Sequence, residues 1–254
     1  MKNHRTLGPD ETLDALFDGG VELYQSRSGY RFSLDAVLLA HFVKVKERAR
    51  VVDLGAGNGA VTLMLAFLYR TARVVGVEIQ PAMLERARRS VALNALQDRV
   101  SMRSGDVRAP AALGEAASFD VAVCNPPYRA PLSGRVSPNP EKRVARHEVQ
   151  GELGHFLKAG GFLLRRKGRL ALIYPAFRCV DVLASMRAVD IEPKRLRMVH
   201  SSCGVEASLL LVEGVKEGKS EITVEAPLFV YDQEQCYRAE IAAMLRGINN
   251  QRKS

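Results

Sequence analysis

The sequence predicts an α/β fold built on a doubly wound, mostly parallel sheet. The stretches RVVDLGAGNGAVTLMLAFLYR and RVVGVEIQPAMLERARRSVALNAL each read as a strand followed by a helix, which is the alternation of a helix-covered parallel sheet. The run Val121 to Cys124 is apolar at consecutive positions, as in a strand buried on both faces. Further strands are expected at Val100 to Met102, Arg169 to Tyr174, Pro193 to Val199 and Ser208 to Glu213, and further helices at Glu148 to Leu164 and Arg178 to Val189.

The length and composition favour one domain with short extensions. The chain has 254 residues, of which 47% are hydrophobic, and this is enough for a sizeable core. We expect an N-terminal extension and a helix over residues 1–48, a core over residues 49–214, and a strand and helix appendage over residues 215–254.

The charge of the chain favours a polyanionic partner, nucleic acid before others. The formal net charge is +9, although such an excess can also serve solubility. The four cysteines show neither a Cys-x-x-Cys pair nor a His partner at metal-ligand spacing, so we expect reduced thiols, a cytoplasmic protein and no metal site. The N-terminal residues lack the apolar segment of a signal peptide, and no apolar run near them is long enough to cross a bilayer.

The N-terminal region is expected to hold two helices. A short one is predicted around Glu11 to Phe17. A second, apolar helix is predicted over Ala36 to Val43, with Ser33 and Asp35 as possible N-caps. This second helix would cover the sheet.

A glycine-rich turn follows the first core strand. Gly55, Gly57 and Gly59 let the backbone approach a ligand closely, and the helix that begins at Ala60 directs its N–H groups at that ligand. The same residues fit the G-x-G-x-x-G/A pattern of dinucleotide sites, and a tight turn without a ligand is the alternative. Asp53 favours a cofactor with a cationic aminoacyl group, because a carboxylate there would repel a pyrophosphate.

Glu78 ends the next strand, where a cofactor ribose would lie. A carboxylate accepts two donors at once and therefore suits a pair of ribose hydroxyls. The alternative is a solvated strand end.

The motif Asn125-Pro126-Pro127-Tyr128 ends the apolar run at Cys124. The two prolines fix φ and have no N–H, so they hold the chain in an extended conformation. The Asn125 amide oxygen and the Pro126 carbonyl can each accept one N–H, while the Tyr128 ring stacks on a planar group. The motif therefore suits a planar substrate that carries an NH2 group.

The long loop after Tyr128 is basic. It lacks apolar periodicity and includes Arg129, Arg143, Arg146 and His147, which would form a rim suited to a phosphate backbone. A merely solvated loop is the alternative.

These motifs resemble those of class I methyltransferases, which use S-adenosylmethionine. Asp-Leu-Gly-Ala-Gly-Asn-Gly at 53–59 is similar to their first motif, and Asn125 to Tyr128 matches the Asn-Pro-Pro-Tyr of their amino-methylating members. The Asp-Ala-x-Leu-Leu-Ala pattern from Asp35 resembles the bacterial tRNA (adenine-N6)-methyltransferases. The resemblance implies a Rossmann-like seven-stranded sheet with helices on both faces and an antiparallel last strand.

The resemblance also implies S-adenosylmethionine as cofactor and an adenine of RNA, next to the anticodon of a tRNA, as substrate. In the family pattern Asp106 accepts from the adenine amino group of the cofactor. The cofactor-binding residues implied are Asp35, Asp53, Gly55, Ala56, Gly57, Asn58, Gly59, Glu78, Ile79, Asp106, Val107 and Asn125.

Three other functions remain possible from the sequence. A glutamine methyltransferase acting on release factors uses the same motif, but its family carries a longer N-terminal domain than the space before Val51 allows. A guanine-N2 rRNA methyltransferase usually has Phe in place of Tyr128. An RNA-binding module with a relic pocket would have lost the Asp53 loop or Asn125, and both are present.

Overall fold

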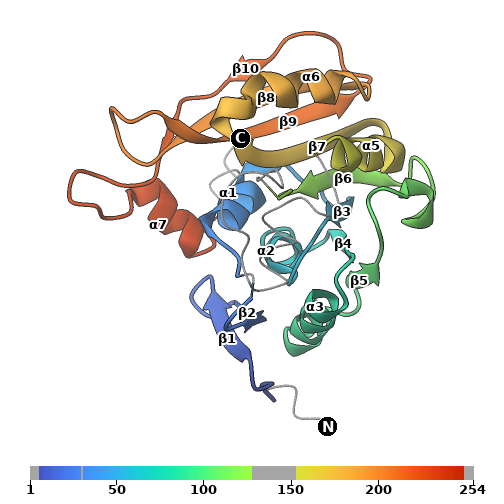
Figure 1. Ribbon diagram of the computed structural model, residues 1–254, viewed down its shortest axis with the longest axis vertical. Helices are drawn as coiled ribbons and strands as arrows, with labels where there is room; N and C mark the ends of the chain where they lie inside the picture. Colours follow the sequence, from blue (N-terminus) through green and yellow to red (C-terminus); the bar gives the residue numbers. More distant parts are fainter. Residues whose placement is uncertain (1–5, 30, 128–152, 249–254) are drawn as a thin grey trace.

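A computed structural model describes residues 6–29, 31–127 and 153–248, and these residues form a central mixed sheet with helices on both faces (Figure 1). The strands follow the order β10-β8-β9-β7-β6-β3-β4-β5, and β11 pairs with β8 beside this path. Their bounds are β3 Arg50–Leu54, β4 Arg73–Glu78, β5 Val100–Ser104, β6 Phe119–Cys124, β7 Leu164–Pro175, β8 Ile191–His200, β9 Ala207–Lys216, β10 Thr223–Val224 and β11 Leu228–Phe229.

The strand directions confirm the predicted sheet. Strands β5, β4, β3, β6 and β7 are parallel, and β9 runs antiparallel between β7 and β8. Strands β3 to β9 are thus the seven strands of the predicted sheet, and the last of them in sequence, β9, is the antiparallel one. Strands β10 and β11 are two residues long each, and both pair with β8. From β3 the chain first builds β4 and β5 on one side and then β6 and β7 on the other. We call the edge of the sheet at which the parallel strands end the carboxyl edge. Ligands of such sheets bind beyond this edge, at the point where the strand order switches sides.

The two faces of the sheet are packed by different helices. Side chains alternate along β3, so that Val51 belongs to the core on one face and Val52 and Leu54 to the core on the other. The first face is covered by α1 (Leu34–Phe42), α2 (Ala60–Leu68), α3 (Pro81–Leu93) and α7 (Ala239–Leu245), and the second by α5 (Leu153–Leu163) and α6 (Cys179–Arg187).

The predicted helix at Glu11 to Phe17 is wrong. Residues Glu11–Leu16 form β1, which pairs antiparallel with β2 (Val21–Ser26). The turn between them places Phe17, Asp18 and Gly19 at positive φ, which ends any helical path. The hairpin is held by α3, because the Ser90 hydroxyl accepts a hydrogen bond of 2.9 Å from the Tyr24 amide. Long-range contacts of this kind leave no local signal in the sequence.

The start of α1 differs slightly from the prediction. Ser33 occupies the N-cap position in an extended conformation, whereas Asp35 lies inside the first helical turn and is therefore not a cap. A carboxylate in the first turn still interacts favourably with the helix dipole.

Candidate active site

The glycine-rich turn lies between the carboxyl end of β3 and the start of α2. Gly55, Gly57 and Gly59 all have positive φ, between 59° and 84°, and side chains other than glycine rarely adopt this region. A Cβ at Gly55 would lie 2.8 Å from the Phe156 ring, so the turn is also closely packed against α5. Ala56 and Asn58 are buried, while Gly55 is exposed at the carboxyl edge.

Glu78, at the end of β4, organises this turn. Its Oε2 accepts a hydrogen bond of 2.8 Å from the Gly57 amide, and its Oε1 accepts one of 2.7 Å from the Gln80 amide. The residue is only 4% exposed, so the alternative of a solvated strand end is excluded. A carboxylate can accept more than two donors, so these two bonds do not by themselves prevent Glu78 from binding a ligand. Ile79, the next residue, is half-buried.

Asp53 lies beneath the turn on the α2 face of the sheet. The Thr62 hydroxyl of α2 donates a hydrogen bond of 2.7 Å to its Oδ2, and the residue is buried. Burial is the main reason that the pKa of Asp53 rises to about 7; the Thr62 hydrogen bond opposes the rise and the charge of Glu78 adds to it. The side chain thus links β3 to α2, and its predicted attraction for a cationic aminoacyl group stays a prediction.

Replacing Asp53 with asparagine is expected to change how stability depends on pH. The folded protein keeps the carboxyl protonated up to about pH 7, whereas the unfolded chain releases the proton near 3.8, the ordinary pKa of an aspartate side chain. Stability from this group is therefore full below pH 3.8 and is lost as the pH rises through 7. Because Asn accepts the Thr62 bond without a charge, and each pKa unit of the shift corresponds to about 1.4 kcal/mol, the variant should gain about 4 kcal/mol in unfolding free energy relative to the wild type between pH 4 and 8.

Denaturant unfolding at several pH values measures this difference, with the exposed Asp98→Asn as the control. Parallel pH profiles for Asp53→Asn and the wild type would contradict the raised pKa. A weaker affinity of the variant for the cofactor would support the electrostatic role predicted for Asp53.

Gln25 is a site residue that sequence reasoning missed. Its Oε1 accepts hydrogen bonds from the Asn58 amide group at 3.1 Å and from the Phe32 amide at 2.9 Å, and its own amide group contacts Asp14. Asn58 belongs to the glycine-rich turn, so the N-terminal hairpin holds that turn in place. Because Glu22 and Ser26 of the same strand are polar too, the sequence gives no signal that singles out Gln25.

Asp106 follows β5 and is engaged by a neighbour that the sequence analysis did not single out. The Arg108 guanidinium donates to both carboxylate oxygens at 2.6 to 3.0 Å, and the Arg108 amide adds a bond of 2.9 Å. The hydrogen bonds from the Arg108 side chain are the main cause of a lowered pKa of Asp106. Val107 beside it is buried. A cofactor amino group at this position would donate to a carboxylate that already accepts hydrogen bonds from Arg108.

The end of β6 brings Asn125 to the same edge. Leu54 of β3 pairs with Cys124 of β6, so Asn125 lies opposite Gly55, the first residue of the glycine-rich turn. Pro126 is buried and Pro127 is half-buried, and the rigid bend predicted at these prolines stays a prediction. Asp35 is half-buried in the first turn of α1. The predicted residues Tyr128, Arg129, Arg143, Arg146 and His147 lie outside the described residues.

The part of the chain that forms the carboxyl edge matches a known protein family. Residues 33–177 match the methyltransferase small domain family, a span that runs from the residue before α1 to the residues after β7 and covers more than half of the chain. The chain belongs to the methyltransferase small domain family.

Similar proteins give the same result. The tRNA1(Val) (adenine(37)-N6)-methyltransferase of Porphyromonas gingivalis is 32% identical, over 69% of this chain and 76% of its own length. The equally named protein of Tolumonas auensis is 26% identical over 87% and 90%. Among solved structures, an Agrobacterium tumefaciens protein described as a predicted O-methyltransferase has a TM-score of 0.70 at 24% identity and covers 84% of this chain and 96% of its own, which supports the fold.

Membership in this family makes the protein a methyltransferase whose cofactor is S-adenosylmethionine. When bound, this cofactor supplies an electrophilic methyl group on a sulfonium. The residues present fit such a group, since the turn places Gly55 and Gly57 at positive φ beside the Glu78 carboxylate. Within the described residues, no group of three or more His, Cys, Asp or Glu side chains could hold a metal ion.

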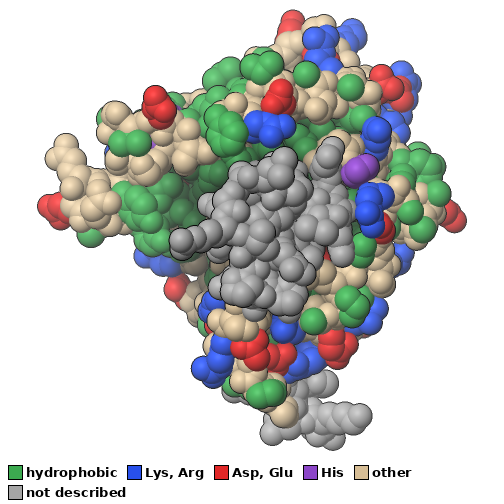
Figure 2. Space-filling model, viewed as in Figure 1, with side chains coloured by type: hydrophobic (Ala, Val, Ile, Leu, Met, Phe, Trp, Pro, Cys, Tyr) green, Lys and Arg blue, Asp and Glu red, His purple; other side chains and the backbone are tan. Residues whose placement is uncertain are grey.

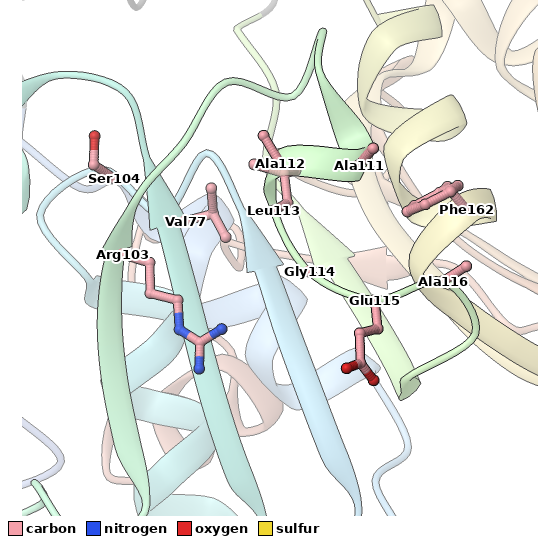
Figure 3. A pocket seen from close by; sticks show the side chains of 10 residues that line it. All are labelled: Val77, Arg103, Ser104, Ala111, Ala112, Leu113, Gly114, Glu115, Ala116 and Phe162. Atoms are coloured by element: carbon pink, nitrogen blue, oxygen red, sulfur yellow. The ribbon is translucent and has the colours of Figure 1, made fainter.

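A cavity of about 550 Å³ lies next to the site, on the α5 face of β4 and β5 (Figure 3). Val77 and Ser104 directly precede Glu78 and Gly105 along the chain, and the wall is completed by Arg103, residues 111–116 and Phe162 of α5. The connection from β5 to β6, which contains the short 3-10 helix η1 (Pro110–Ala112), contributes most of the lining residues.

No helix in the described part of the chain combines the length and the apolar character that a membrane span needs.

Proposed function

We propose that the protein methylates the exocyclic N6 of an adenine in RNA, in a tRNA at the position next to the anticodon, and that it acts in the cytoplasm. The observation that carries this proposal is the position of Asn125 and Pro126 at the switch point, opposite the glycine-rich turn. The activity named for the relatives from Porphyromonas gingivalis and Tolumonas auensis supports the same substrate. The division of the chain at residues 48 and 214 into extension, core and appendage also stays a proposal.

In this proposal Asn125 and Pro126 orient the reacting nitrogen. The exocyclic nitrogen of adenine is a poor nucleophile because its lone pair is delocalised into the ring. If the Asn125 amide oxygen and the Pro126 carbonyl each accept one N–H, the nitrogen becomes pyramidal and its lone pair points at the methyl group. No side chain needs to remove a proton first, so the rate gain comes from orientation and electrostatic fit.

The cofactor would be held by backbone and carboxylate groups of three neighbouring strand ends. Glu78 would accept the ribose hydroxyls, and Asp106 would accept from the amino group of the cofactor adenine. The glycine-rich turn would approach the aminoacyl end, with Asp35 and Asp53 nearby. Ile79 and Val107 would contact the adenine ring from the ends of β4 and β5.

The RNA would contribute a base removed from its stack. Base-modifying enzymes turn the target base out, at least cost where it is already unpaired. Tyr128 would replace the lost stacking partner, and Arg129, Arg143, Arg146 and His147 would contact the phosphates. The net charge of +9 favours binding to a polyanion.

Methylation of separate substrate pools tests the proposal. The purified protein is incubated with labelled cofactor and, in separate reactions, tRNA, rRNA and release factors. We expect label in tRNA, recovered as N6-methyladenine after digestion. Label in a glutamine of a release factor, or in N2-methylguanine of rRNA, would replace the proposed substrate by one of the alternatives.

A further inference from the structure

The side chain of Phe177 is 83% exposed, which is unusual for a large aromatic ring. It lies in the 3-10 helix η2 (Ala176–Arg178), which follows the carboxyl end of β7. Val180, three residues later at the start of α6, is 79% exposed. Single exposed apolar side chains are common on proteins, so the position of this pair, and not its exposure alone, gives it meaning.

Phe177 lies at the same edge of the sheet as Asn125. Strands β6 and β7 are parallel, and Cys124 pairs with Leu172, so Asn125 lies opposite Ile173. The chain advances two residues further to Pro175, the end of β7, and then turns into η2. From a strand spacing of about 4.8 Å and a rise of about 3.3 Å per residue, Phe177 lies roughly 10 to 15 Å from Asn125. Unpaired nucleotides of one RNA loop can bridge this distance.

Further aromatic rings follow along the carboxyl edge. Strand β11 runs parallel to β8 and ends beside it. The residues after it bring the Tyr231 and Tyr237 rings into a stack with centroids 5.2 Å apart, and Tyr237 is 46% exposed. Figure 2 shows hydrophobic side chains gathering around α7 and the loop that joins β8 to β9. The Arg238 guanidinium lies 5.7 Å from the Phe229 ring centroid, so a cation accompanies these rings.

We propose that Phe177 stacks on an unpaired base that flanks the methylated adenine, so that the RNA runs from Asn125 across η2. This inference rests on the proposed function and adds a second stacking residue to it. An exposed aromatic ring beside a catalytic edge suits a base, because every base presents a π face whatever its sequence. The backbone of η2 is fixed by β7 on one side and α6 on the other, so the ring is presented without ordering a long loop.

Two variants of Phe177, one control variant and a set of abasic RNAs test the inference. Phe177→Ala should weaken tRNA binding by about 5- to 100-fold, as for the loss of one stacked base, while cofactor affinity and thermal stability stay unchanged. Phe177→Tyr should keep wild-type affinity. The control is Val224→Ala, since Val224 is 65% exposed on β10 but pairs with Leu196, away from the carboxyl edge.

The modified RNA identifies the base that Phe177 contacts. A tRNA with one abasic nucleotide beside the target adenine should bind equally to the wild type and to Phe177→Ala, because the stack is already lost. The stacking is refuted if Phe177→Ala binds intact tRNA as tightly as the wild type does. It is also refuted if the loss of affinity caused by Phe177→Ala is the same for every abasic RNA as for intact tRNA. Altered self-association of Phe177→Ala with unchanged tRNA affinity would assign the ring to a protein contact instead. Failure of the wild-type protein to methylate tRNA would refute the proposed function itself.

Discussion

Replacing Asn125 with alanine is expected to lower the rate of methyl transfer by about 100- to 1,000-fold, as for the loss of one preorganised polar contact in an active site. The variant loses the amide oxygen that would hold one N–H of the adenine, so the nitrogen is no longer oriented. The cofactor affinity should change little, because the glycine-rich turn and Glu78 are untouched. Single-turnover methylation of tRNA and equilibrium binding of the cofactor measure the two effects separately.

The matched control for this experiment is Asn125→Asp. Aspartate keeps an acceptor oxygen at the same position and has the same size, so it should retain more activity than alanine. It replaces the Asn125 NH2 by a second acceptor and introduces a negative charge, so any remaining loss reports these two changes together. A near-normal single-turnover rate for Asn125→Ala would overturn the role given to this side chain.

Replacing Glu78 is expected to have the largest effect on cofactor binding. The two carboxylate oxygens accept from the Gly57 and Gln80 amides, and removal by alanine leaves both N–H groups without this partner. Each such bond to a charged acceptor is worth about 1.5 to 3 kcal/mol, so the turn should lose its shape as well as its ribose contact. We expect the Kd of the cofactor to rise by about 100-fold or more, measured by calorimetry.

Glutamine should not rescue this position. In Glu78→Gln one oxygen becomes an NH2 group, which would face a backbone N–H of either Gly57 or Gln80, and two donors repel. The control Glu85→Gln removes an exposed carboxylate from α3 and should leave the Kd unchanged. Wild-type cofactor affinity in Glu78→Gln would show that the acceptor pair does not shape the turn.

The sequence by itself determined the sheet and the ends of its strands. Apolar runs interrupted by glycine, by Glu78 or by prolines are local signals, and the strands they predict are present at β3, β4 and β6. Because parallel strands all end at one edge, the adjacent strands β3 and β6 bring the glycine-rich turn and Asn125 to the same edge of the sheet.

Only the tertiary structure decided what the polar side chains near this edge contact. The β1–β2 hairpin replaced an expected helix because α3 holds Tyr24, and Gln25 then reaches Asn58 from a distant part of the chain. Asp53 turned toward Thr62 because the alternation of β3 places it on the α2 face. The position of a side chain at the end of a strand can be predicted from local sequence, whereas its hydrogen-bond partners depend on which elements pack beside it.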